Sequence, residues 1–71
     1  MTFKYQGTRD NGTPRYEVWQ EGTSNYFGLV QRADAERQYV FVSAIPFGKR
    51  LNADMLSEIA NFCKTETERN Q

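Results

Sequence analysis

Four segments of the chain are typical of β-strands, and the first two alternate apolar and polar residues with the period of two of half-buried strands. The four segments are residues 3–8, 15–21, 26–31 and 38–45, and clusters of turn-forming residues separate them. The pair Asn11-Gly12 between the first two segments is a strong signal for a β-hairpin. The fourth segment is almost continuously apolar, β-branched or aromatic, and we expect Pro46 to end it because proline has no N–H to donate.

The apolar spacing changes to that of a helix after residue 52. Asn52 is a favourable N-cap, and Leu51 and Leu56 are spaced as a hydrophobic staple. Residues 53–65 place one apolar stripe on a helix of about 13 residues, made of Met55, Leu56, Ile59, Ala60, Phe62 and Cys63. Residues 66–71 contain no apolar side chain, so we expect a disordered polar tail after a single domain formed by residues 1–65.

These elements predict an α+β fold with two layers. The connections between the strand segments are too short for parallel crossovers, so the sheet should be antiparallel. We therefore expect a four-stranded antiparallel β-meander packed on one C-terminal α-helix.

Both faces of the predicted sheet are substantially apolar, and one short helix covers only one of them. The more aliphatic face consists of Phe27, Leu29, Val40, Val42 and Ala44. We favour this face as the one under the helix because small and branched side chains allow a close approach. Strict alternation in the second strand places Trp19 on one face with Glu17 and Glu21. The alternative, in which the helix covers the aromatic face, stays open.

The other face would then be exposed and would bind a partner. Its side chains are Tyr16, Val18, Tyr26, Val30, Tyr39 and Phe41. Tyrosine combines apolar area with a polar tip and is enriched at interfaces. Large apolar patches rarely stay bare on monomers. We expect a non-enzymatic interaction or regulatory module that forms a homodimer or binds a protein partner here. Screening of this face by long polar side chains, or by the N-terminal segment, is the alternative.

The composition gives little support to a catalytic or a metal-binding function. The 71 residues include one cysteine and no histidine, which excludes an internal disulfide and triads that use a histidine base. Cys63 lies on the apolar helix stripe, as an inert core thiol would. Asp54 and Glu58 are one helical turn apart, a spacing more typical of a solvated helix face than of a metal site. We expect no enzyme activity, no cofactor and no metal.

Nucleic acid binding is the second hypothesis. Arg32, Arg37, Lys49 and Arg50 would form basic loops beside the sheet. The arrangement is similar, at the level of fold only, to the sheet and C-terminal helix of integrase arm-binding domains, and no motif residue carries over. Nine basic residues balance nine acidic ones, whereas domains that bind nucleic acid carry a positive excess. We therefore favour a protein partner.

The chain contains neither the roughly 20 apolar residues of a membrane helix nor the apolar core of a secretory signal. With its lone thiol, this pattern predicts a cytoplasmic protein without membrane contact. Many small accessory proteins of phages and mobile elements have this size, and we expect a regulator of that kind.

Overall fold

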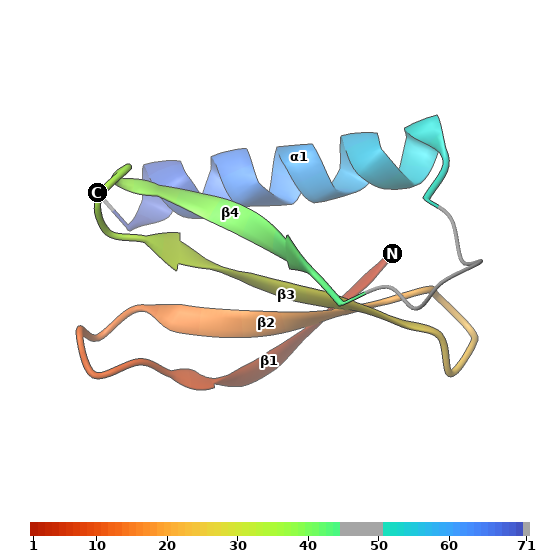
Figure 1. Ribbon diagram of the computed structural model, residues 1–71, viewed down its shortest axis with the longest axis horizontal. Helices are drawn as coiled ribbons and strands as arrows, with labels where there is room; N and C mark the ends of the chain where they lie inside the picture. The colour runs from red at the N-terminus through yellow and green to blue at the C-terminus, as the bar shows by residue number, and fades with distance from the viewer. Residues whose placement is uncertain (45–50, 71) are drawn as a thin grey trace.

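The computed structural model describes residues 1–44 and 51–70. The described chain forms strands β1 (Thr2–Thr8), β2 (Pro14–Trp19), β3 (Tyr26–Ala33) and β4 (Gln38–Ser43), followed by helix α1 (Ala53–Arg69). The strands form one antiparallel sheet in the order β1-β2-β3-β4. Helix α1 lies along one side of this sheet (Figure 1). The predicted two-layer α+β fold, a meander followed by a helix, is confirmed.

The turn-forming residues between β1 and β2 form a hairpin turn at the predicted position. Arg9 N donates to Thr13 O and Gly12 N donates to Arg9 O, which closes the hairpin between β1 and β2. Gly12 has φ +86°, a left-handed conformation that glycine adopts without steric cost. Strand β4 is described through Ser43, and the predicted ends of that strand, Ile45 and Pro46, lie outside the described residues.

Helix α1 begins as predicted, because the Asn52 side chain accepts a hydrogen bond from Met55 N at 2.8 Å. The predicted end at residue 65 is wrong, since the helix continues to Arg69. Residues 66–69 are therefore helical rather than a disordered tail. The reason is that Glu66 is buried and Thr67 contacts the sheet: Tyr39 N donates to Thr67 Oγ1 at 2.8 Å.

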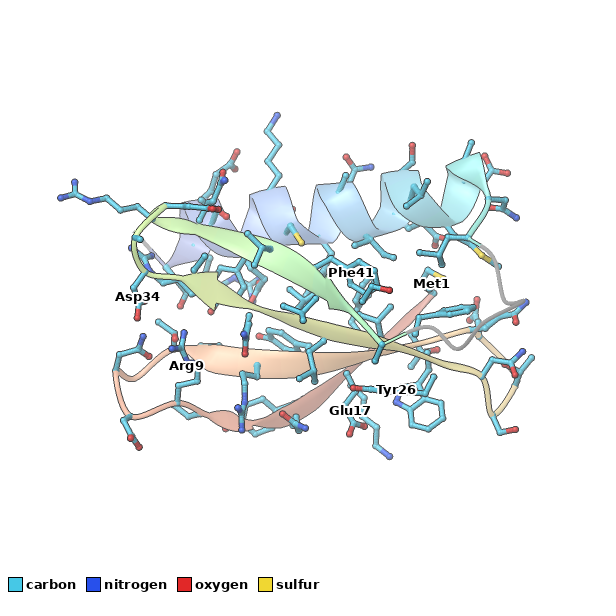
Figure 2. The ribbon with its side chains drawn as sticks, in the orientation of Figure 1. Met1, Arg9, Glu17, Tyr26, Asp34 and Phe41 are labelled. Atoms are coloured by element: carbon cyan, nitrogen blue, oxygen red, sulfur yellow. The ribbon has the colours of Figure 1, made fainter. Side chains whose placement is uncertain are left out.

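The hydrophobic core lies between α1 and the aromatic face of the sheet. Fully buried core side chains are Val18, Phe27, Val30, Tyr39 and Ile59. Phe3 of β1 stacks on Phe62 of α1 with ring centroids 4.0 Å apart. Phe41, between sheet and helix in Figure 2, packs against this core. The preferred assignment of the aliphatic face to the helix is therefore wrong, and the alternative holds.

Gly28 is the position where β4 comes closest to β3. A Cβ atom there would collide with the backbone oxygen of Val42 and would lie 3.1 Å from the ring of Phe41. Its φ of +148° is also one that other residues rarely adopt. Gly28 therefore allows the backbones of β3 and β4 to approach closely and leaves room for the ring of Phe41.

Candidate interaction surface

The sheet face that points away from α1 carries apolar side chains from three strands. We call it the open face, and its apolar members are Trp19, Tyr26, Leu29, Val40 and Val42. Leu29 of β3 is directly opposite Val42 of β4, and Val42 is 44% exposed. The remaining four are half-buried. Figure 2 shows Tyr26 and Glu17 on this side of the sheet, opposite Phe41 and the helix.

A β-bulge places Tyr26 on the open face. The register between β2 and β3 shifts between Val18 and Trp19, so that Trp19 is opposite Tyr26 while Val18 is opposite Gly28. The extra residue, Phe27, is buried in the core. Strict alternation would put Tyr26 on the same face as Val30, and the bulge reverses this by adding one residue to β3. The rings of Trp19 and Tyr26 consequently meet with centroids 5.2 Å apart.

Two opposite charges lie beside this apolar group. Lys4 of β1 is directly opposite Glu17 of β2 in the sheet register. Glu17 Oε1 also accepts a 3.1 Å hydrogen bond from Trp19 Nε1, which orients the indole ring on the open face. The open face thus combines an apolar strip over β3 and β4 with a polar border over β1 and β2.

Five of the six predicted partner-binding residues lie under the helix instead of facing outward. Val18, Val30 and Tyr39 are fully buried, and Tyr16 and Phe41 pack against them. The expectation that this set is exposed is wrong, except for Tyr26. The physical reason is that both tyrosine tips find partners: Tyr16 OH donates to Glu66 Oε1 at 2.7 Å, and Tyr39 OH donates to Pro14 O at 3.1 Å.

A signal for the correct face was present in the sequence. Alternation in β2 puts Glu17 on the same face as Trp19. Ionised side chains are rarely buried without a partner, so a sheet face that holds a glutamate is the poorer candidate for covering by a helix. The open-face residues Trp19, Leu29, Val40 and Val42 were missed as candidate binding residues because the aliphatic character of the face outweighed its charge.

The predicted basic residues do not form one surface in the described part of the chain. Arg32 is bound internally: its Nη1 donates to Asn70 O at 3.0 Å and its Nε lies 3.6 Å from Asp34. Arg37 is exposed in the turn after β3, where its φ is +56°. Lys49 and Arg50 lie outside the described residues. Arg32 holds the end of the helix to the sheet and is unavailable for a phosphate backbone.

The hydroxyls of Tyr16 and Tyr39 and the thiol of Cys63 are held in their neutral forms. Burial, followed by the hydrogen bond to Glu66, raises the pKa of Tyr16 to about 12. Burial also raises the pKa of Tyr39 and that of the Cys63 thiol, which keeps this thiol protonated and unreactive at neutral pH.

Other reactive or metal-binding groups are scattered over the described residues. Glu58 Oε1 accepts a 3.1 Å hydrogen bond from the amino group of Met1. Within residues 1–44 and 51–70, no three carboxylate or thiol groups gather in a way that suits a metal ion. No helix in the same residues has the length and apolar character needed to cross a membrane.

Comparison of the chain with protein-family models, with curated proteins and with solved structures finds no match.

Proposed function

We propose that the protein is a small non-enzymatic interaction module that pairs with a second copy of itself through the open face. The observation that supports this is the apolar strip formed by Leu29, Val40 and Val42 on neighbouring strands, on the face opposite α1. Burial of such a strip is favourable by about 25 cal/mol for each Å² of apolar surface removed from water. A monomer leaves it in contact with solvent.

A second copy fits this face because the face complements itself. A twofold interface brings the same patch of both subunits together, so each group must find its complement within that patch. Lys4 and Glu17 are adjacent and opposite in charge. The proposal requires a twofold axis that passes close to this pair, so that Lys4 of one copy lies near Glu17 of the other. The formal net charge of zero also removes long-range repulsion between two copies.

The non-enzymatic part of the proposal is supported by the available side chains. The chain has no histidine to serve as a general base. Its single thiol, Cys63, is kept protonated by burial, which raises its pKa. A protein with one free thiol suits a reducing compartment, and we place it in the cytoplasm.

Sedimentation equilibrium over a wide concentration range tests the pairing. We expect the wild-type chain to pass from monomer to dimer as concentration rises, and Val42→Glu to remain monomeric. Leu56→Glu is the matched control because Leu56 is an apolar residue of similar exposure, 50% against 44%, on the helix. A wild-type chain that stays monomeric contradicts the proposal. Equal loss of dimer in both variants, or a dimer that survives Val42→Glu, contradicts it as well.

Charge reversal tests the orientation of the two copies. Lys4→Glu should weaken the dimer several-fold, the effect of an exposed ion pair worth about 0.2–1 kcal/mol. The double variant Lys4→Glu, Glu17→Lys should restore it, because each new lysine again meets a glutamate of the other copy. If the double variant is as weak as the single one, the two charges do not meet across the interface.

A further inference from the structure

A polar pocket lies at the end of the sheet where the turn between β1 and β2 comes close to the turn between β3 and β4. Figure 1 shows both turns at this end, and Figure 2 shows Arg9 and Asp34 there. The pocket has a volume of about 420 Å³ and is lined by Thr8, Arg9, Asp10, Asn11, Arg15 and Asp34. This volume is within the range of small-molecule sites, and the polar lining favours a charged ligand.

Half of the lining residues, Arg9, Asn11 and Asp34, are held in place by an internal network. Asn11 Nδ2 donates to both carboxylate oxygens of Asp34, at 2.9 and 3.1 Å. Guanidinium nitrogens of Arg9 and of Arg32 each lie 3.6 Å from the same carboxylate. Arg9 Nη1 also donates to Arg32 O. The two turns are therefore fixed to one another, and the carboxylate of Asp34 is already neutralised.

Arg15 is the basic lining residue that this network leaves out. It lies on β2 opposite Gly7 of β1. Its Nε is buried without a hydrogen-bond partner, and within the described residues no carboxylate lies within ion-pair distance of its guanidinium. A buried donor without a partner is unfavourable. Among the described residues no acceptor pairs with this Nε, so its N–H is left to bond an anion in the pocket.

The charged side chains that line the pocket balance, because Arg9 and Arg15 supply two positive charges and Asp10 and Asp34 supply two negative ones. Asp34 is also 3.6 Å from Arg32, which lies outside the lining, so two arginines offset its charge. The planar guanidinium group suits two oxygens of one oxyanion. We propose that this pocket binds a small oxyanion of the phosphate type, with Arg15 as its principal donor and the remaining N–H groups of Arg9 assisting. This site is separate from the pairing of two copies proposed above.

Titration of the ¹⁵N-labelled full chain with inorganic phosphate tests this site, with sodium chloride at matched ionic strength as the reference. We expect saturable shifts of the Arg15 Nε–Hε signal and of the Thr8 and Asn11 amides with phosphate, and no saturation with chloride. Shifts that do not saturate, or that chloride reproduces, overturn the proposal.

Two variants distinguish a specific phosphate site from a general attraction of phosphate to positive charge. Arg15→Gln should weaken phosphate binding about tenfold or more, the factor expected when a charge-assisted hydrogen bond is lost. Arg37→Gln removes the same charge from a neighbouring exposed turn, outside the pocket lining, and should leave the affinity within about twofold. An equal loss in the two variants contradicts the proposal.

A third variant keeps the test decisive if Arg15→Gln fails to fold. Asp10 is exposed, lines the pocket and repels an anion there. Asp10→Asn should therefore bind phosphate several-fold more tightly than the wild-type chain. An unchanged or weaker affinity in Asp10→Asn, checked for folding by circular dichroism, overturns the assignment.

Discussion

The hydrogen bond between Tyr16 and Glu66 joins strand β2 to the last turns of α1, 50 residues away in sequence. Glu66 is only 2% exposed, and its second oxygen lies 3.4 Å from Arg69 Nη1. Tyr16→Phe removes the donor and keeps the ring, which meets Phe62 edge to face with centroids 4.9 Å apart. The variant therefore tests the hydroxyl separately from the packing of the ring.

The expected loss follows from the burial of the acceptor. A hydrogen bond to a charged group contributes about 1.5–3 kcal/mol, and the carboxylate oxygen stays buried when its donor is removed. We expect Tyr16→Phe to lower the free energy of unfolding by about 2 kcal/mol, close to half of the roughly 3–5 kcal/mol available to a domain of this size. The melting temperature should fall by roughly 8–16 °C, since 1 kcal/mol corresponds to about 4–8 °C.

Urea and thermal unfolding followed by far-ultraviolet circular dichroism measure this loss. Tyr5→Phe is the matched control: Tyr5 is 60% exposed, and its hydroxyl meets Thr8 Oγ1 at the surface. That variant should lose less than about 0.5 kcal/mol. Adding Glu66→Leu to Tyr16→Phe should recover part of the loss, because no charge is then left buried. Equal losses in the two tyrosine variants would refute the reasoning.

Three other perturbations follow from the same structure. Burial and the bond to the buried carboxylate raise the pKa of Tyr16 from 10.0 to about 12, so the unfolded chain ionises first. Stability should therefore fall as pH rises from about 10 to 12, less steeply in Tyr16→Phe, as urea titrations at each pH will show. Gly28→Ala forces a Cβ against the backbone of Val42 and should lower the free energy of unfolding by about 3 kcal/mol or more. Gly12→Ala has open space around its Cβ but keeps a φ of +86°, so it should lower the free energy of unfolding by about 1 kcal/mol. Asn52→Ala removes the N-cap and should lower the unfolding free energy by about 1 kcal/mol, measured by urea unfolding and restored by Asn52→Ser.

Features that depend on neighbours in sequence could be predicted from the sequence alone. The turn at Asn11-Gly12, the residue pattern of the four strands and the cap at Asn52 each depend on a few adjacent residues, and the structure contains all three. The end of α1 could not be found this way. The polar run after residue 65 has no apolar stripe, yet Tyr39 N donates to Thr67 Oγ1 and Arg32 donates to Asn70 O. Hydrogen bonds to β3 and β4, which are distant in sequence, stabilise the last turn of the helix. A pattern of neighbouring residues cannot predict such bonds.

The choice of sheet face under α1 also depends on distant partners. Alternation separates the two apolar faces except for Tyr26 and Phe27, which the bulge in β3 exchanges, and it does not tell which face the helix covers. Helix α1 covers the aromatic face because its side chains find partners there. Phe62 packs against the rings of Phe3 and Tyr16, and Glu66 accepts a hydrogen bond from the Tyr16 hydroxyl. Glu66 looks like an ordinary surface residue in the sequence, although it becomes the most buried charged residue among those described. An apolar and a polar residue of the helix thus both find partners on the aromatic face, and the face left open is the one that carries Lys4 and Glu17.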